Sequence, residues 1–285
     1  MTKTSDVLTA LGASPYHGRG QHFLTNRNIA QRIVDITAPG PESVVVEIGP
    51  GTGALTDLLT ERAGRVIAIE SDRKLACYLT DAFRDRAEIV FGDALSFDYR
   101  ELGKGIGASF LVVANLPYNI STELIFRLLD VREHVERMVL MLQKEVAQRL
   151  VAKPGTKEYG VLTVLVTMLC DVSTALSVGP GNFHPRPKVD SRVVVFDMLR
   201  ESRVPVKDMQ LFRRVVRASF GTRRKTLRNA LRSLSDIIER DALSEIEGIT
   251  GLDFTRRGET LTIGEFAIIA DTLHDILHPD APDQS

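Results

Sequence analysis

The sequence is poor in cysteine, in long hydrophobic runs and in net charge, and the first two shortages exclude whole classes of protein. Its 285 residues include only two cysteines, Cys77 and Cys170, which lie far apart and lack the spacing of metal ligands. A disulfide scaffold and a cysteine-ligated metal site are therefore excluded, and we interpret both cysteines as buried, reduced thiols of a cytosolic protein. No apolar run reaches the length of a transmembrane helix, and the first twenty residues lack the pattern of a targeting signal. We therefore expect a cytoplasmic protein with no membrane partner.

The chain is long enough for two domains of unequal size. With 44% hydrophobic residues, it can bury one large core and one small core. Residues 21–200 alternate between strand and helix patterns, whereas the pattern beyond Pro205 is helical throughout. We expect an N-terminal arm over residues 1–20, an α/β domain over residues 21–204 and a small all-α domain over residues 205–285.

The formal net charge of −1 conceals an uneven distribution of charge. Residues 203–232 contain ten Lys and Arg and one acid, so the rest of the chain carries a charge of about −10. Two arginine pairs lie four residues apart, Arg213 with Arg217 and Arg224 with Arg228. That spacing places each pair on one helix face, where like charges repel and a polyanion would relieve the repulsion. The pattern favours an RNA-contacting surface over an ordinary solvated helix face.

The most informative motif is Asn115-Leu116-Pro117-Tyr118, which directly follows the apolar run 110–114. Such a run is typical of a buried parallel strand, and ligands bind at the carboxyl ends of these strands. The Asn115 oxygen and a backbone carbonyl at Leu116 or Pro117 can accept both N–H bonds of an exocyclic amino group. Tyr118 can stack on the ring that carries this group. Taken alone, the motif could equally be an ordinary strand-to-turn junction.

A glycine loop upstream favours a ligand site over an ordinary strand-to-turn junction at residues 115–118. The strand candidate 43–48 runs into Gly49-Pro50-Gly51-Thr52-Gly53 and then into a helical pattern, which is the nucleotide-binding opening of a doubly wound fold. Its glycines let the backbone approach a ligand closely. Glu47, just before the turn, would oppose a pyrophosphate but would suit a cation. S-adenosylmethionine (SAM) carries an ammonium and a sulfonium and no phosphate, so the motif favours SAM over NAD.

Two further acids follow strand candidates at matching intervals. Glu70 ends the strand candidate 65–69, and Asp93-Ala94 follows the candidate 87–91. The steps from Glu47 to Glu70, Asp93 and Asn115 are 23, 23 and 22 residues, and each fits one strand and one crossover helix. We expect Glu70 to accept the ribose hydroxyls of SAM and Asp93 to accept a hydrogen bond from its adenine amino group. The fold class expected is a Rossmann-like SAM-dependent methyltransferase with a mostly parallel, doubly wound sheet.

Nearly the whole chain resembles the adenine-N6 dimethyltransferases of small-subunit (16S) ribosomal RNA. Besides the motifs above, the resemblance rests on four segments: residues 20–24 (GQHFL), 183–191 (FHPRPKVDS), 220–231 (FGTRRKTLRNAL) and 257–262 (RGETLT). The last two segments resemble the C-terminal domain of the dimethyladenosine transferases more than the antibiotic-resistance methylases of large-subunit rRNA.

The resemblance implies a function and a set of site residues. SAM contacts carry over to His22, Leu24, Gly49, Glu70, Asp93 and Asn115, with Glu47, Gly51, Gly53 and Ala94 completing the expected cofactor site. His22 stands where the family often has Asn. The resemblance places Phe183 at the active site beside residues 115–118, and we expect RNA contacts from Arg223, Arg224, Lys225 and Arg228. The implied reaction is dimethylation of two adjacent adenosines in the 3′-terminal hairpin of 16S rRNA on an assembling 30S subunit, by a monomer without a metal.

Three other functions compete with this interpretation. A NAD-dependent oxidoreductase is disfavoured by the acid before the glycines. A non-catalytic ribosome-assembly factor is disfavoured by the intact motif at residues 115–118. A DNA adenine methylase is disfavoured by the basic C-terminal segment and by the resemblance of residues 183–191 to the RNA enzymes.

Overall fold

The computed structural model divides into two compact units that are not contiguous in sequence. The structure describes residues 4–12, 21–222, 224–238 and 242–279. The first unit contains residues 1–147 and 171–200, and the second contains residues 148–170 and 201–285. The segment 148–170 therefore groups with the C-terminal residues, although it lies within the α/β part of the sequence.

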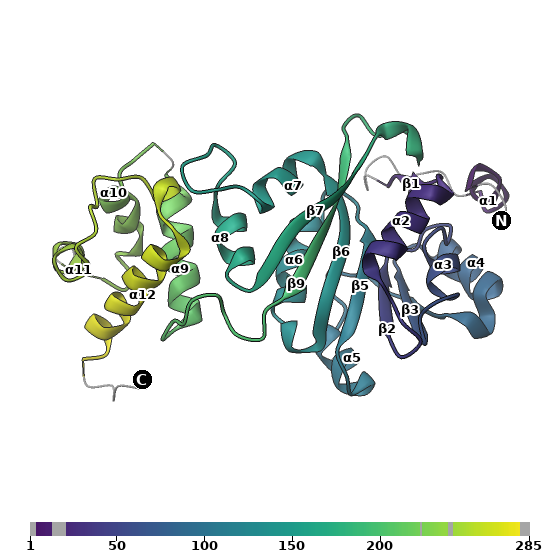
Figure 1. Cartoon of the computed structure of the whole chain (residues 1–285), viewed down its shortest axis with the longest axis horizontal. Coiled ribbons are helices and arrows are strands. Elements are labelled where there is room, and N and C mark those ends of the chain that lie inside the picture. Colours follow the sequence, from purple (N-terminus) through teal and green to yellow (C-terminus); the bar gives the residue numbers. More distant parts are fainter. Residues whose placement is uncertain (1–3, 13–20, 223, 239–241, 280–285) are drawn as a thin grey trace. The chain divides into compact units, whose positions relative to one another are not determined.

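The first unit is built on a seven-stranded sheet whose strand order is β4-β3-β2-β5-β6-β9-β7 (Figure 1). The strands are β2 (Val44–Ile48), β3 (Arg65–Glu70), β4 (Glu88–Phe91), β5 (Phe110–Asn115), β6 (Val135–Gln143), β7 (Cys170–Val178) and β9 (Ser191–Met198). From β4 to β6 every pairing is parallel, whereas β9 runs antiparallel to β6. The expected α/β class with a mostly parallel sheet is confirmed.

Helices connect these strands, and three of the helices begin at a capping side chain. They are α1 (Thr4–Ala10), α2 (Arg27–Thr37), α3 (Thr56–Leu59), α4 (Arg73–Phe83), α5 (Tyr99–Ile106), α6 (Ser121–Leu129) and α7 (Lys144–Leu150). Asn26, Asp72 and Asp98 accept backbone N–H bonds at the starts of α2, α4 and α5. The central strand β5 is buried on both faces from Phe110 to Ala114, as its unbroken apolar run predicts.

A separate two-stranded ribbon lies outside the main sheet. Strand β1 (Phe23–Leu24) runs antiparallel to β8 (Phe183–His184), with Phe23 opposite His184 and Leu24 opposite Phe183. The ribbon joins two segments of the resemblance that are about 160 residues apart in sequence.

The second unit is helical. It contains α8 (Val161–Thr167), α9 (Met209–Gly221), α10 (Leu227–Leu231), α11 (Ala242–Thr250) and α12 (Ile263–Leu277). Its core includes the fully buried rings of Phe212, Phe254 and Phe266. The helix α12 begins with a capping box between Thr262 and Glu265, which the sequence spacing predicts.

One prediction about burial is wrong. Cys170 is buried, as expected, but Cys77 is exposed. The reason is its position in α4, where the buried stripe falls on Leu75, Ala76 and Leu79, so Cys77 points away from the sheet. Separately, no helix in the described part of the chain is both long and apolar enough to cross a membrane.

Candidate functional site

A pocket of about 590 Å³, including space open to solvent, lies at the carboxyl ends of the parallel strands. Eight of the expected site residues line it: His22, Gly49, Gly51, Glu70, Asp93, Ala94, Asn115 and Pro117. Leu24 and Glu47 instead line a smaller adjoining pocket of about 280 Å³, which shares Gly49, Gly51 and Asn115 with the first. Gly53, Leu116, Tyr118 and Phe183 line neither pocket.

The three glycines of the loop have different structural roles. All three have positive φ angles, 68° at Gly49, 59° at Gly51 and 85° at Gly53. A Cβ added at Gly51 would lie 2.7 Å from the Phe23 ring, and one at Gly53 would lie 2.6 Å from the Phe83 ring. A Cβ at Gly49 would meet no atom within 4 Å. Gly49 therefore leaves open space for a ligand, whereas Gly51 and Gly53 allow close packing.

Glu70 is a buried acceptor next to this loop. Its side chain is 3% exposed. One carboxylate oxygen accepts the N–H of Gly51 at 3.1 Å, and the other accepts the N–H of Asp72 at 2.9 Å. Burial raises the pKa of this carboxyl, and these two backbone N–H bonds oppose that rise. Glu70 thus shapes the glycine loop as well as lining the pocket.

Glu47 is more deeply enclosed than Glu70. It is 1% exposed and accepts a hydrogen bond of 2.6 Å from the Thr56 hydroxyl. Burial raises the pKa of Glu47 to about 8. Glu47, which the sequence suggests as a charged partner for a cation, therefore holds its proton much more strongly than an exposed glutamate does.

Asp93 and Ala94 form the wall of the pocket that follows β4. Asp93 is exposed and accepts the N–H of Leu95 at 2.9 Å. The Ala94 carbonyl accepts a hydrogen bond of 3.0 Å from the buried hydroxyl of Tyr99. Burial raises the pKa of Tyr99 strongly, so this hydroxyl remains a donor. Sequence reasoning missed Tyr99; the signal for it was an aromatic residue directly after the helix cap Asp98.

Asn115 is held in one orientation. Its side-chain nitrogen donates to the His22 carbonyl at 2.8 Å, so its oxygen remains to accept a ligand hydrogen. The Pro117 carbonyl accepts the N–H of Ile120 at 3.3 Å, which favours the Leu116 carbonyl as a second acceptor. Leu116 itself is buried, at 2% exposure.

The two aromatic residues expected at the site differ in position. Tyr118 is half-buried, its ring lies 5.3 Å from the His22 ring, and its hydroxyl lies 3.1 Å from the Ser191 hydroxyl. Phe183 is only 6% exposed and packs in the core cluster with Leu24. The structure therefore brings Tyr118 next to a pocket residue and holds Phe183 in the core.

The expected RNA-binding residues lie in the second unit. Arg223 is outside the described residues, and Arg224 and Lys225 are exposed. The prediction that Arg224 and Arg228 share one helix face is wrong, because Thr226 caps α10 and the helix begins only at Leu227. Arg228 forms an ion pair with Glu247, which also accepts the N–H of Phe254.

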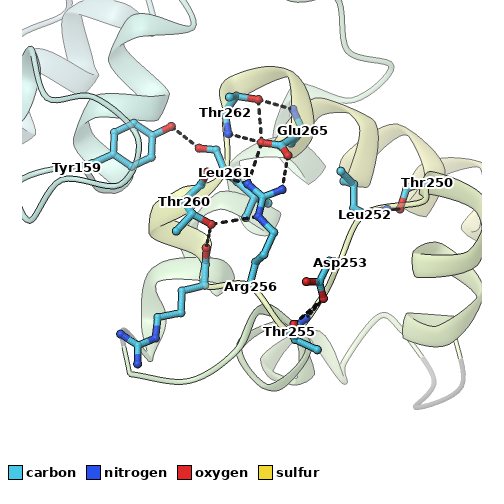
Figure 2. Close-up of polar contacts among 11 residues, drawn as sticks. Tyr159, Thr250, Leu252, Asp253, Thr255, Arg256, Thr260, Leu261, Thr262 and Glu265 are labelled. Carbon is cyan, nitrogen blue, oxygen red and sulfur yellow. Dashed lines mark hydrogen bonds and ion pairs between the residues drawn. The ribbon is translucent and has the colours of Figure 1, made fainter.

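The segment at residues 257–262 belongs to a polar network around Arg256 in the second unit (Figure 2). Arg256 donates to the Thr260 carbonyl at 2.8 Å and forms an ion pair with Glu265. The Leu261 carbonyl accepts a hydrogen bond of 2.8 Å from Tyr159, as Figure 2 shows. Together with the bond from the Gly155 N–H to the Glu259 carbonyl, at 2.7 Å, this network fixes the loop before α8.

Among the described residues, no group of three or more His, Cys, Asp or Glu side chains is arranged to hold a metal ion.

Comparisons with known proteins agree with this geometry. The sequence profile of the family described as "Ribosomal RNA adenine dimethylase" matches residues 17–269. The chain is 48% identical over 254 residues to "Ribosomal RNA small subunit methyltransferase A" of Geobacter metallireducens, covering 88% of this chain and 92% of that protein. A crystal structure of a dimethyladenosine transferase from Plasmodium falciparum superposes with a TM-score of 0.75 at 26% identity, covering 87% of this chain and 96% of that chain. A crystal structure of a 23S rRNA methyltransferase shares the fold, with a TM-score of 0.66, 23% identity and coverage of 88% and 99% of the two chains.

Proposed function

Because the chain belongs to the ribosomal RNA adenine dimethylase family, we propose that it dimethylates N6 of two adjacent adenosines in the 3′-terminal hairpin of 16S rRNA. It is an rRNA adenine-N6 dimethyltransferase that uses SAM. Its substrate is the small ribosomal subunit during assembly, and it acts as a monomer in the cytoplasm. The observation that supports this most directly is the Asn115 amide, which the His22 carbonyl orients beside the pocket.

The pocket residues fit SAM and disfavour a dinucleotide. Among the described residues that line the pocket there are two carboxylates, Glu70 and Asp93, and no Lys or Arg. Such a lining suits the positive charges of SAM and repels a pyrophosphate. The open space at Gly49 admits a ligand against the backbone. We assign Glu70 to the ribose hydroxyls and Asp93, with the backbone at Ala94, to the adenine.

The target base would be held by Asn115 and its neighbours. Bound SAM supplies an electrophilic methyl group on a sulfonium. The Asn115 oxygen and the Leu116 carbonyl accept the two N6 hydrogens of the target, which favours a pyramidal nitrogen with a localised lone pair. Because this nitrogen is a weak nucleophile, positioning provides most of the catalysis, and well-oriented groups reach effective molarities of about 10⁵–10⁸ M.

The flipped adenine also needs a stacking surface. Removing a base from its stack costs a few kcal/mol, and stacking on an aromatic side chain returns about 1–3 kcal/mol. We assign this role to Tyr118, because its ring packs against the His22 ring of the pocket and its hydroxyl lies 3.1 Å from the Ser191 hydroxyl. Phe183 could stack only after leaving the core in which it is buried. After the first transfer one N–H remains on N6, and a single acceptor must then hold the base.

Transfer of labelled methyl groups from SAM to unmethylated small ribosomal subunits tests this function. We expect two methyl groups on each of two adjacent adenosines, located by mapping the modified nucleotides. Naked large-subunit rRNA and double-stranded DNA are the control substrates, and the Asn115→Ala variant is the control enzyme. Equal labelling of DNA would indicate a DNA methylase instead. Binding of subunits without any methyl transfer would indicate a non-catalytic assembly factor.

A further inference from the structure

The β1–β8 ribbon connects the pocket to an exposed basic loop. On one strand, Phe23 and the two residues before it line the cofactor pocket. The other strand continues from His184 into residues 185–190. A displacement of either strand would therefore be transmitted to the other.

Hydrogen bonds outside the strand pairing reinforce the short ribbon at both ends. At one end, the Thr25 N–H donates to the Asn182 carbonyl at 2.9 Å, and the Asn26 amide donates to the Asn182 side chain at 2.8 Å. At the other end, the His22 ring donates from Nδ1 to the Pro185 carbonyl at 2.7 Å. Since a carbonyl can only accept, this bond fixes the proton on Nδ1.

The ribbon is also bonded to the proposed catalytic residues. The His22 carbonyl accepts the bond from Asn115, and the His22 ring packs against Tyr118. Tyr118 in turn reaches Ser191, at the far end of the loop. These contacts therefore link the pocket-lining segment before and in β1, the Asn115 side chain and the loop at residues 185–190.

The outer side of the loop presents unpaired positive charge. His184, Arg186 and Lys188 are all exposed. Within the described part of the chain, neither Arg186 nor Lys188 forms an ion pair, whereas Asp190 is paired with Lys144 at 3.6 Å. Two free cations on a loop beside the pocket suit the phosphates of a nucleic acid.

We propose that Arg186 and Lys188 contact rRNA phosphates next to the target adenosine, and that the ribbon makes SAM binding and RNA binding strengthen each other. This inference rests on the proposed function. If SAM stabilises the strand at residues 21–24, it also stabilises the loop bonded to that strand. By thermodynamic linkage, RNA then raises the affinity for SAM by the same factor.

The coupling is measured as the ratio of SAM dissociation constants without and with saturating unmethylated small subunits. We expect a ratio of about 5 or more in the wild-type protein, within the usual range for coupled sites. In Asn26→Ser, the serine side chain can still cap α2 but is too short to reach Asn182. The ratio of SAM dissociation constants should therefore fall to within twofold of one. Asn182→Ala removes the same bond from the other side, together with the bond from the Asn182 side chain to the Gly179 carbonyl, and should also lower the ratio. A wild-type ratio of one overturns the coupling, and a full ratio in both folded variants overturns the ribbon as its route.

The RNA contacts are tested with Arg186→Ala/Lys188→Ala against Lys104→Ala/Arg132→Ala. The control pair removes the same charge from the elements that precede β5 and β6: Lys104 lies in α5, where it is ion-paired with Glu101, and Arg132 lies in the short helical turn before β6. Both residues lie on the amino-terminal side of these strands, whereas the pocket lies at the carboxyl ends. The logarithm of the affinity for subunits falls linearly with the logarithm of the salt concentration, by about 0.7 per phosphate contacted on single strands. Only the loop variant should make this slope shallower, by about 1.4 for two lost phosphate contacts. Equal slopes in both double variants overturn the contact. Methyl transfer by the wild-type protein to the same subunits is measured in parallel. A lack of transfer refutes the proposed function, whereas normal transfer without coupling or without the change in slope refutes only this inference.

Discussion

Glu47 and Glu70, at neighbouring strand ends, are both buried but differ in their surroundings. Glu70 accepts two backbone N–H groups and lines the larger pocket, whereas Glu47 is bonded to the Thr56 hydroxyl. Backbone donors stabilise a carboxylate, so Glu70 is the better ligand group. Glu47 is the better candidate for a residue whose protonation makes the free energy of unfolding depend on pH.

Glu47→Gln should change how stability depends on pH. The pKa of Glu47 is raised from 4.5 to about 8, so between these values the folded state binds more protons than the unfolded state. The stabilising effect is complete below about pH 4.5 and is lost as the pH rises through 8, with a slope of up to about 1.4 kcal/mol per pH unit. The neutral Gln should flatten the decline in the free energy of unfolding between about pH 5 and 8. Urea denaturation of both proteins across this range measures it, with the exposed Glu101→Gln as the control; parallel curves for wild type and Glu47→Gln would contradict it.

Glu70→Ala should weaken SAM binding by about one to two decades. A hydrogen bond to a charged group is worth about 1.5–3 kcal/mol. Calorimetric titration with SAM measures the loss, and unchanged affinity would refute the assignment. Glu70→Gln can still accept the Gly51 N–H, so recovered affinity in that variant would show that Glu70 acts by shaping the loop.

Asn115→Ala should reduce methyl transfer by roughly 100-fold or more, as removal of a positioned polar group does at other active sites. SAM binding should remain measurable, because other residues of the pocket are unchanged. Single-turnover transfer and calorimetry on the same variant separate the two effects. Activity within a few-fold of wild type would show that the amide does not orient the target.

Among the secondary-structure elements, the glycine loop gives a matched pair of substitutions. Gly49→Ala and Gly53→Ala incur similar strain, since both residues have positive φ angles. Only the alanine at residue 53 meets a ring, that of Phe83, and overpacking there should add about 1–3 kcal/mol of destabilisation. Gly49→Ala should instead lose SAM affinity while staying folded. Thermal melts with and without SAM distinguish these outcomes, and equal melting temperatures for the two unliganded variants would contradict the packing role of Gly53.

The sequence predicts elements where one local pattern determines them. Apolar runs followed by a polar residue predict β2, β3 and β5, because a strand buried on both faces must be apolar throughout. The same pattern predicts β4, although β4 is a partly exposed strand at the edge of the sheet. The same local reasoning failed at Arg224 and Arg228, where Thr226 caps a new helix between them. It also missed Tyr99, whose hydroxyl bond to Ala94 depends on how α5 packs. Residue spacing within one segment contains no information on such contacts.

In the whole molecule, chain order and spatial grouping differ. Residues 148–170 precede β7 in sequence but group with the C-terminal helices. The bonds responsible, such as the one from Tyr159 to Leu261, join residues about 100 positions apart, which no local pattern reveals. The pocket proposed to bind SAM nevertheless lies within one unit, and the exposed Arg224 and Lys225, which are proposed to contact RNA, lie within the other, so the two proposed roles can be tested separately.

Neutralising the basic turn should therefore weaken RNA binding without changing SAM affinity. For Arg224→Ala/Lys225→Ala we expect the salt dependence of subunit binding to flatten by about 1.4 in slope, with no change in melting temperature, because both side chains are exposed. Arg228→Ala is the contrasting variant. It removes the partner of Glu247 and should lower the melting temperature by a few degrees, leaving the slope nearly unchanged. A flattened slope for Arg228→Ala at an unchanged melting temperature would instead make Arg228 an RNA contact, and its ion pair with Glu247 would then be one that RNA displaces.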